Sequence, residues 1–408
     1  MSWSRRALFV MPPFSRHAAR RNWEALEEFY NPMRVFEQVA IVSLGETAAD
    51  VPREIGSLRI YSVSGEGLHP YAHLLGNGAV RRLSRASRQV LEIAERHRVD
   101  LLIQRYGGPL RHGLPVVWAA ACMGVPSIIT VQSDYDAYLK WDHGPVKRVA
   151  HRAVETPLWR WLFRNTSAVW TVSRFLADVV VRQGAHPGQV VTIYNKDSID
   201  KFAQRPPQAQ LETTMSHLGV PPAALEGPLL LSVGRLIGQK NYSRMIKAFA
   251  ELVHAGATAH YVIVGGGPLE QGLRAQLAAE GLVDSVTLIT DYLSAAELRD
   301  LYHAATALVF CSLSEGQGRT PVEAMACGTP VVGSDLGPIP EVVEHAVTGL
   351  LVDPFSPKAI AGAMNRFASE RGFAGSMGDA CVASARRFDM DTINPREAAL
   401  YRRVMGSG

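Results

Sequence analysis

The sequence contains few cysteines and carries little net charge. Its 408 residues include four cysteines, which lie too far apart for a CxxC pair or for the ligand spacing of a zinc site: Cys122, Cys311, Cys327 and Cys381. Neither a disulfide framework nor a structural zinc site is therefore indicated, and we expect a reducing, cytoplasmic environment. The formal net charge of +4 is too small for general nucleic-acid binding.

No uncharged run is long enough to suggest a membrane span without a break. The longest, from Leu114 to Val131, approaches the roughly 18 residues at which a transmembrane helix is considered. Gly124 and Pro126 divide this run, which predicts a buried helix followed by a buried strand. Near the start of the chain, the apolar run ALFVM is too short for a signal peptide and predicts a first β-strand.

Short apolar runs rich in β-branched residues alternate with helical patterns, which predicts βαβ units and parallel sheets. The periodicity lapses in a polar, proline-containing stretch from Lys201 to Pro228. We therefore expect two doubly wound α/β domains, at 1–205 and 206–385, and a C-terminal helix in 386–408. The strand-like runs are ALFVM, VAIVSL, LRIYSV, DLLIQR, SIITV, AVWTVS and VVTIY in the first half, and LLLSVG, YVIVGG, SVTLIT, ALVFCS, TPVVGS and GLLVD in the second.

Two cations flank the loop that follows the strand LLLSVG. Arg235 and Lys240 lie on either side of this loop, and Asn241 is placed to cap the helix that begins there. Two positive charges and a helix N-terminus at the carboxyl end of a strand favour a phosphate site. Taken singly, either cation is equally well explained as a solvated loop charge.

Another loop contains three consecutive glycines, Gly265 to Gly267, before a helix that we expect to begin at Pro268. Glycines let backbone amides approach a ligand closely, although a tight turn is the alternative explanation. The segment is not a dinucleotide fingerprint, because GxGxxG starting at Gly265 requires a glycine where Glu270 stands.

Two glutamates separated by seven residues stand in the segment EGQGRTPVEAMACGTPVV. Thr320, Pro321 and Glu323 match an N-cap, a first helical residue and a capping-box acid, which is a full structural explanation of Glu323. Glu315 has no such explanation, since it precedes the helix in a glycine-rich loop. A loop with free amides and an unpaired carboxylate can hold a phosphate and accept hydrogen bonds from sugar hydroxyls.

These motifs together resemble those of a known family. The set GRLIGQKN, VGGGPLE, EGQGRTPVEAMACGTPVV and GLLVD, in this order from Val233 to Asp353, resembles the donor-binding domain of glycosyltransferase family 4. That family consists of retaining enzymes of the GT-B fold, an α/β architecture in which two doubly wound, Rossmann-like domains face each other across a cleft. The resemblance implies transfer of a sugar from a nucleotide-diphosphate sugar, a UDP- or GDP-sugar first of all, to a glycan, glycolipid or small-molecule acceptor, as in polysaccharide biosynthesis.

By this resemblance, Arg235 and Lys240 bind the diphosphate and stabilise it as a leaving group. Glu315 contacts donor-sugar hydroxyls near the reacting carbon, and Glu323 hydrogen-bonds the ribose. No metal is required if the two cations act in this way, and we expect a metal-independent enzyme without a cofactor. The other implied donor-binding residues are Gly265, Gly266, Gly267 and Pro268 near the nucleotide, Asp291 and Tyr292 near the base, and Gly316, Gln317, Gly318, Arg319 and Thr320 at the sugar and phosphate.

Several alternatives stay open. Asp291 stands where the family usually has glycine, which leaves the base of the donor undetermined. A nucleophilic role of Glu315 and a front-face displacement assisted by the leaving phosphate are both compatible with the sequence. A non-catalytic sugar-nucleotide-binding subunit and a nucleotide-sugar epimerase of the same fold are the alternative functions. A phosphorylase would need a pyridoxal-binding lysine, which none of the seven lysines resembles in its context.

The first half resembles the family more weakly and is expected to bind the acceptor. The loop after the first strand lacks the usual paired glycines, and Ser15 as a helix cap, or Arg16, is the expected substitute. Gln132 stands where many relatives have histidine and cannot shuttle a proton near neutral pH. The remaining acceptor-side candidates follow two strands: Arg105, Tyr106, Asp134 and Asp136. Solvated loop acids are the alternative for the two aspartates.

Positive charge is concentrated in the first half. Residues 1–210 hold 27 Lys and Arg against 18 Asp and Glu, whereas residues 211–408 hold 15 against 20. The stretch from Val146 to Arg164 interleaves arginines with aromatic residues, and Pro157 should interrupt a single amphipathic helix there. Solvated helices explain this pattern, and peripheral contact with the inner, anionic face of a membrane is the alternative. By resemblance, the final helix REAALYRRVM packs back on the first domain.

Overall fold

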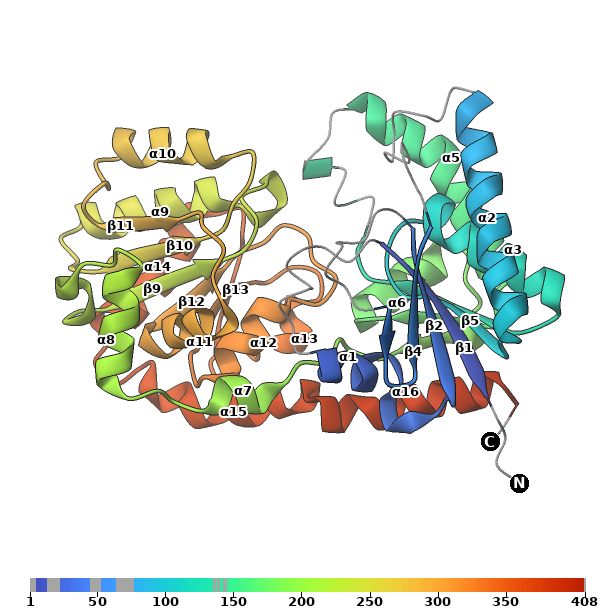
Figure 1. Ribbon diagram of the computed structural model, residues 1–408. Helices are drawn as coiled ribbons and strands as arrows, with labels where there is room; N and C mark the ends of the chain where they lie inside the picture. Colours follow the sequence, from blue (N-terminus) through green and yellow to red (C-terminus); the bar gives the residue numbers. More distant parts are fainter. Residues whose placement is uncertain are drawn as a thin grey trace. The chain divides into compact units, whose positions relative to one another are not determined.

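The computed structural model describes residues 5–12, 23–44, 53–63, 77–134, 137, 140–141 and 145–406 (Figure 1). The chain forms two compact units. Unit 1 comprises Met1–Gln132, Gly144–Tyr194 and Ile393–Gly408, and unit 2 comprises Ser133–His143 and Asn195–Thr392. The domain limits expected near 205 and 385 stay predictions.

Unit 1 is built on an eight-stranded sheet in which β1 pairs with β2 on one side and β5 on the other. The pairings are parallel except that of β3 with β4, which is antiparallel. Strand β3 is a two-residue edge strand, too short to be recognised from a sequence pattern. In sheet order the strands are β3 (Glu54–Ile55), β4 (Leu58–Val63), β2 (Gln38–Leu44), β1 (Arg6–Met11), β5 (Leu101–Gln104), β6 (Ser127–Val131), β7 (Ala168–Thr171) and β8 (Val190–Thr192).

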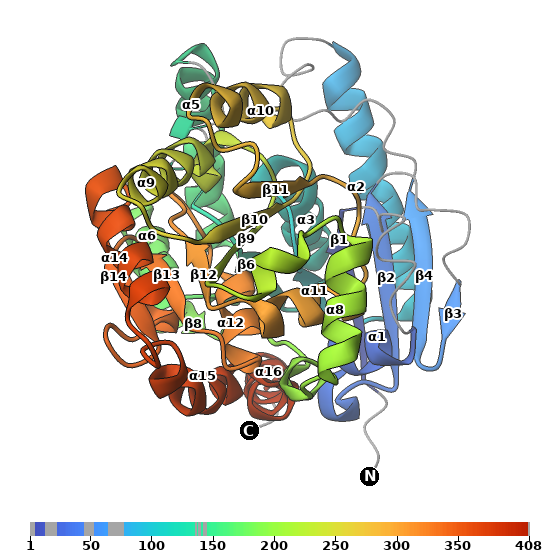
Figure 2. The same cartoon turned by 90° about the vertical axis from the view of Figure 1, so that its left-hand side faces the viewer.

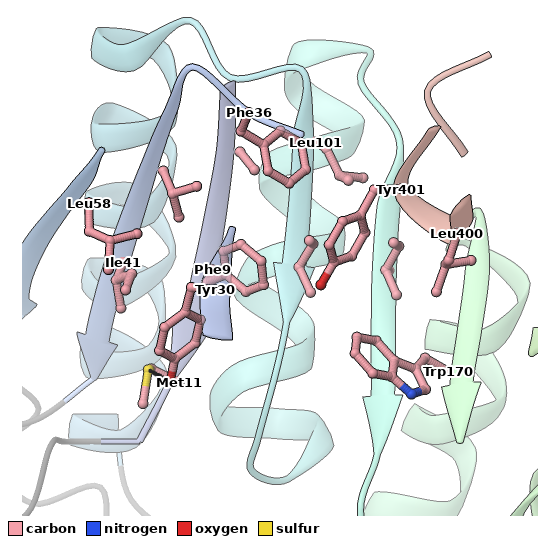
Figure 3. Close-up of a cluster of buried hydrophobic side chains, with 14 of the residues drawn as sticks. Phe9, Met11, Tyr30, Phe36, Ile41, Leu58, Leu101, Trp170, Leu400 and Tyr401 are labelled. Carbon is pink, nitrogen blue, oxygen red and sulfur yellow. Dashed lines mark hydrogen bonds between the residues drawn. The ribbon is translucent and has the colours of Figure 1, made fainter. Parts of the chain in front are cut away.

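Helices cover both faces of this sheet. On one face, Tyr30 of α1 and Tyr401 of α16 pack against strand residues such as Phe9 and Trp170 (Figure 3). Tyr401 and Trp170 have no exposed surface, and each buried aromatic stabilises the unit by about 1.5–3 kcal/mol. The main helices of unit 1 are α1 (Trp23–Tyr30), α2 (Asn77–His97), α3 (Leu114–Met123), α5 (Pro145–Arg164), α6 (Arg174–Arg182) and α16 (Met390–Val404).

The expected break in the longest apolar run is confirmed. Helix α3 ends where Gly124 takes a left-handed conformation with φ 67°, and the buried strand β6 follows. The expected interruption at Pro157 is wrong, because α5 continues through it. Trp159 and Phe163 stack beyond the proline, with ring centroids 5.3 Å apart, and both are buried. Their burial offsets the lost helical hydrogen bond.

Unit 2 is a six-stranded parallel sheet with β9 and β12 adjacent at its centre. The strand order reverses between these two strands, and ligands of doubly wound sheets bind at such a switch point, beyond the carboxyl ends of the strands. In sheet order the strands are β11 (Val286–Ile289), β10 (His260–Val264), β9 (Leu229–Val233), β12 (Ala307–Phe310), β13 (Val331–Ser334) and β14 (Gly349–Val352).

Two groups of helices flank the sheet of unit 2 (Figure 2). One group packs α9 (Tyr242–His254) against α10 (Glu270–Ala279) and α14 (Pro357–Ser369). The other group packs α11 (Ala295–Ala304) against α8 (Gln208–His217) and α12 (Arg319–Ala326), and α12 also contacts α7 (Ile199–Ala203) and α15 (Gly378–Ala385). A short helix, α13 (Ile339–Val342), follows β13. All thirteen strands expected from apolar runs are present in the two sheets.

The C-terminal segment forms a long helix. Helix α16 begins in unit 2 at Met390 and from Ile393 onward belongs to unit 1. Its Tyr401 ring lies with its centroid 6.3 Å from that of Phe9 and 6.4 Å from that of Trp170. The C-terminal segment is therefore part of the hydrophobic core of unit 1.

Candidate donor site in unit 2

The loop after β9 carries both predicted cations, and their surroundings differ. Arg235 is exposed, and its guanidinium has no ion pair or hydrogen bond within the described ranges. Lys240 is largely buried, and its Nζ lies 2.5 Å from Oε1 of Glu315 and 5.0 Å from the ring centroid of Phe310, the last residue of β12. The fold thus brings together two of the predicted residues that are 75 positions apart.

This ion pair lies at the switch point of the sheet, because Lys240 follows β9 and Glu315 follows β12. The side chains of Lys240 and Glu315 are 15% and 13% exposed, so the pair is largely withdrawn from water while each partner still reaches the surface. Nearby, the Tyr242 hydroxyl donates to the Gly234 carbonyl over 2.8 Å. Burial raises the pKa of Tyr242 well above its ordinary value, so this phenol stays a neutral donor.

Asn241 holds the N-cap position of α9, but its side chain does not cap the helix as expected. Asn241 takes a left-handed conformation with φ 63°, and this turns its side chain away from the first helical amides. Its amide nitrogen instead donates to the carbonyls of Cys311, over 3.0 Å, and Pro354, over 2.8 Å. Asn241 therefore ties the loop after β9 to the loop after β12.

The glycine loop after β10 packs on the loop after β9. A Cβ at Gly265 would stand 1.9 Å from the Gly234 oxygen, and one at Gly267 would stand 2.5 Å from the Leu236 oxygen. Backbone hydrogen bonds join the two loops, including that from the Leu236 amide to the Gly266 carbonyl, 3.0 Å long. Close packing of two backbones is thus a sufficient reason for two of the three glycines.

The expected start of the following helix is wrong by two residues. Pro268 lies in a turn, Leu269 is the N-cap and α10 begins at Glu270. The Leu269 amide donates to the Leu236 carbonyl, which holds the turn against the neighbouring loop and delays the helix. Pro268 lies beyond the carboxyl end of β10, and its place near the nucleotide stays a prediction.

The capping box expected around Glu323 is absent. Helix α12 begins at Arg319, and its N-cap is Gly318 with φ 99°, so Thr320 lies inside the helix. Glu323 is then in the second turn, too far along for its carboxylate to reach the N-cap amide. A Cβ at Gly318 would stand 2.9 Å from Ile339 Cδ1, so the positive φ and the close neighbour both favour glycine at this turn.

Glu323 instead accepts a hydrogen bond from the Tyr302 hydroxyl, 2.8 Å from its Oε2. Tyr302 lies on α11 and is fully buried, and the side chain of Glu323 is 18% exposed. Tyr302 was not a predicted site residue. The sequence offers no signal for it beyond an aromatic position on the buried face of a helix.

Two predicted donor-binding side chains contact residues 195–197, at the start of the longer stretch of unit 2. Gln317 is buried, and its Oε1 lies 2.5 Å from the Asn195 amide nitrogen. Arg319 binds Asp197 Oδ2 through Nη2 at 2.8 Å and Nε at 3.2 Å. The side chains of Gln317 and Arg319 thus anchor the loop between Glu315 and α12 to residues 195–197. A ligand role for either is a prediction beyond these contacts.

The remaining donor-side candidates lie at the same edge of the sheet. Asp291 and Tyr292 follow β11, and both are exposed. Gly316 is buried between Glu315 and Gln317, and Thr320 is half-buried in the first turn of α12. The predicted donor residues thus follow four neighbouring strands at their carboxyl ends, those of β9, β10, β11 and β12.

The acceptor-side candidates are described in part. Ser15, Arg16 and Asp136 lie outside the described residues. Gln132 ends the first stretch of unit 1, and Asp134 belongs to unit 2, where its Oδ1 accepts a hydrogen bond from the Ala137 amide. Gln132 and Asp134 thus lie in the loop that follows β6, and their contacts assign no acceptor role to either residue.

Arg105 is buried in unit 1, with 1% of its side chain exposed, and Tyr106 beside it is half-buried against the core. Nη2 of Arg105 lies 3.0 Å from Oε1 of Glu397, and the Arg105 guanidinium lies 4.0 Å from the Trp170 ring centroid. The charge of Glu397 raises the pKa of Arg105 despite the opposing effect of burial. These contacts make Arg105 an anchor for α16. No motif in the sequence indicated Glu397 as its partner.

The described residues contain neither a candidate metal site nor a candidate membrane span. No group of three or more His, Cys, Asp and Glu side chains in these ranges is arranged to hold a metal ion. Likewise, no helix in the described part of the chain is both long and apolar enough to cross a membrane.

Two doubly wound units, one with a cation and a carboxylate paired at its switch point, are the architecture of a GT-B protein. The family model "Glycosyl transferases group 1" matches residues 219–386, and the model "Glycosyl transferase 4-like domain" matches residues 26–196. The chain therefore belongs to the family 4-like glycosyltransferases of the GT-B fold. The resemblance drawn from the motifs is confirmed.

Curated relatives are glycosyltransferases. The 2-deoxystreptamine glucosyltransferase of Streptomyces kanamyceticus is 28% identical over 272 residues, which cover 67% of this chain and 69% of that protein. The D-inositol 3-phosphate glycosyltransferase of Streptomyces bingchenggensis is 31% identical over 238 residues, which cover 56% of this chain and 51% of that protein. The chain thus spans about half the length of the second relative.

Solved structures share the fold along the whole chain. A glycosyltransferase from Rickettsia africae superimposes with a TM-score of 0.76 at 16% identity, with both chains fully covered. Anabaena Alr3699/HepE in complex with UDP-glucose superimposes with a TM-score of 0.75 at 19% identity, covering 98% of this chain and 99% of that chain. At these identities the likeness establishes the GT-B fold.

Proposed function

We propose that this glycosyltransferase is a retaining, metal-independent enzyme that takes its sugar from a nucleotide-diphosphate sugar, a UDP- or GDP-sugar first of all. The observation that carries the proposal is the Lys240–Glu315 ion pair beside the exposed Arg235, at the switch point of unit 2. The UDP-glucose complex of a GT-B protein with the same fold supports this class of donor.

The chemistry follows from the charges. Cleavage of the anomeric C–O bond leaves negative charge on the diphosphate and positive charge on the sugar. Arg235 and Lys240, fixed beside the diphosphate, stabilise the charge that develops on the leaving group. Lys240 also orients Glu315, whose carboxylate accepts hydrogen bonds from the donor sugar. Two cations in these positions replace the metal ion that other transferases need.

For the acceptor, we propose one of three classes: a glycan, a glycolipid or a small polyhydroxylated molecule. Support comes from the relatives named for 2-deoxystreptamine and D-inositol 3-phosphate, which are small-molecule acceptors. Retention of the anomeric configuration rests on the family resemblance. NMR of the glycosidic linkage in the product tests it, and an inverted linkage would refute it.

We further propose that the enzyme acts in the cytoplasm, on its own or at the inner face of a membrane. Helix α5 exposes Trp161 between the exposed Arg160 and Arg164, which fits peripheral contact with anionic lipid. Flotation with vesicles that contain anionic lipid tests the membrane part. An equal fraction bound to neutral vesicles would remove it.

The donor assignment is tested by thermal unfolding with UDP-, GDP-, ADP- and dTDP-sugars, each with and without EDTA. A ligand at about 100 times its Kd stabilises the folded state by about 2.7 kcal/mol. We expect one nucleotide class to raise Tm by several degrees, equally with EDTA present. Slow hydrolysis of that donor without acceptor then distinguishes an enzyme from a binding subunit. No shift with any donor would refute the assignment.

A further inference from the structure

Glu323 is held by a residue outside the family motif, the buried Tyr302. The Tyr302 hydroxyl donates to Oε2 of Glu323 over 2.8 Å, from α11 to α12. Tyr302 is itself fixed from two sides. Its ring packs edge-on against Phe202, with centroids 6.1 Å apart, and its carbonyl accepts a hydrogen bond from the Thr329 hydroxyl over 2.6 Å.

This contact has no role in starting the helix. Glu323 lies in the second turn of α12, and the turn into the helix is made by Gly318. The closest ion pair of Arg319 is with Asp197 at 2.8 Å, whereas its Nη2 is 3.9 Å from Glu323 Oε1. A neutral phenol, rather than a close cation, therefore holds Oε2 of this carboxylate.

A phenol suits this task because it orients a carboxylate without neutralising it. Burial raises the pKa of Tyr302 well above its ordinary value, and the charge of Glu323 raises it further, so the hydroxyl remains a donor at any physiological pH. Glu323 keeps its negative charge, and its carboxylate plane is set by a rigid partner. A fixed carboxylate can accept hydrogen bonds from two adjacent hydroxyls at once.

We infer that Tyr302 is a positioning residue that orients Glu323 toward the ribose of the donor and thereby gives the enzyme its preference for ribose over 2′-deoxyribose nucleotides. The inference rests on the proposed function, in which Glu323 binds the ribose hydroxyls. Removal of the phenolic hydroxyl leaves the carboxylate in place but lets it rotate. The contribution of the 2′-hydroxyl to nucleotide affinity then decreases, while the contacts to the phosphates do not change.

The test compares Tyr302→Phe with Tyr261→Phe. Tyr261 is a fully buried tyrosine of the same unit, and its hydroxyl lies 2.7 Å from the Ser232 hydroxyl, so both variants lose one buried hydrogen bond. The probes are UDP and 2′-deoxy-UDP, with GDP, ADP and their 2′-deoxy forms measured beside them, by isothermal titration of the full chain. The kcat and KM of donor hydrolysis are measured in parallel.

We expect the wild type to bind the ribonucleotide at least about tenfold more tightly than its 2′-deoxy form. Tyr302→Phe should weaken ribonucleotide binding about three- to tenfold, the range for one hydrogen bond, and leave 2′-deoxynucleotide binding within about twofold. In Tyr302→Phe, KM should rise with kcat little changed. Tyr261→Phe should keep the wild-type ratio of ribonucleotide to 2′-deoxynucleotide affinity. Phe202→Leu, which loosens the packing of Tyr302, should lower the ratio to a smaller degree.

An unchanged ratio of ribo- to deoxyribonucleotide affinity in Tyr302→Phe would overturn the inference, and so would a wild type that binds both forms equally. Either result leaves the proposed donor site standing, provided that nucleotides bind. A Tyr302→Phe variant that does not fold, with an unchanged ratio in Phe202→Leu, would show a structural role only. If the wild type binds no nucleotide, the proposed function fails with it.

Discussion

Arg235 and Lys240 follow the same strand and share a proposed role, yet their surroundings predict different effects of substitution. Arg235 is exposed, with no partner found among the described residues, whereas Lys240 is 15% exposed and bound to Glu315. We therefore predict that Arg235→Met lowers turnover and leaves stability unchanged. Lys240→Met should lower both, because it also leaves Glu315 without its cation.

The magnitudes follow from the contacts. A charge-assisted hydrogen bond to the leaving diphosphate is worth about 1.5–3 kcal/mol. At 1.36 kcal/mol per factor of ten, loss of either cation should reduce kcat/KM about 10- to 160-fold. Substitution of an exposed, unpaired side chain changes unfolding free energy by less than about 0.5 kcal/mol. Loss of the partner of a largely buried carboxylate costs about 1–3 kcal/mol.

The assay combines steady-state hydrolysis of the donor selected by the thermal screen with urea unfolding of each variant. Arg366→Met serves as a control, since Arg366 is an exposed arginine on α14 in unit 2, paired with Glu370 just beyond the end of that helix. It should keep wild-type kcat/KM. A wild-type rate for Arg235→Met would refute the role of this residue. Equal stability of Lys240→Met and the wild type would show that the ion pair contributes nothing to the fold.

Three further predictions concern the framework. Glu397→Ala leaves the buried Arg105 unpaired and should lower the unfolding free energy by about 3–5 kcal/mol in urea titrations; a loss under about 1 kcal/mol would contradict the burial of the pair. Burial lowers the pKa of His260 below 6.5, so stability present above pH 6.5 should be lost as the pH falls through the lowered value. The decrease in Tm between pH 7.5 and 5.5 should be smaller in His260→Asn than in the wild type. An equal decrease would exclude His260 as a source of this pH dependence. Gly265→Ala should separate two loops and weaken donor binding at a cost of over about 2 kcal/mol, whereas Gly272→Ala, with open space around its Cβ, should be neutral or stabilising in thermal melts.

The sequence predicted the strands well because each is a short apolar run bounded by polar or glycine-rich residues. It predicted helix starts less well, since these depend on contacts with other segments. Pro268 was expected to begin a helix, but the Leu269 amide bonds to the Leu236 carbonyl of another loop. Thr320 was expected as an N-cap, but Gly318, which packs closely against Ile339, takes that position with a positive φ.

Partners in space were beyond the sequence for a related reason. Lys240 and Glu315 were predicted as site residues, but nothing in a pattern of residues 75 positions apart indicates that they pair. Arg105 and Glu397 are 292 positions apart and meet because α16 returns to unit 1. The topology of the chain creates both ion pairs, and only the first involves residues with a recognisable motif.

The structure separates motif residues that the fold requires from those that it does not. Gly265 and Gly267 are needed for two backbones to approach each other, and Gln317 is buried on the backbone of Asn195. These positions would be constrained even in a protein without a ligand.

Arg235, Lys240, Glu315 and Glu323 form the other group. Arg235 is exposed and unpaired within the described ranges, Lys240 and Glu315 form an ion pair in which each partner still reaches the surface, and Glu323 does not cap its helix. Neither a helix start nor a close backbone approach requires these four charges, yet they gather at the carboxyl ends of β9 and β12, where doubly wound sheets bind ligands. The case for donor binding therefore rests on these four side chains and not on the glycines of the same motif.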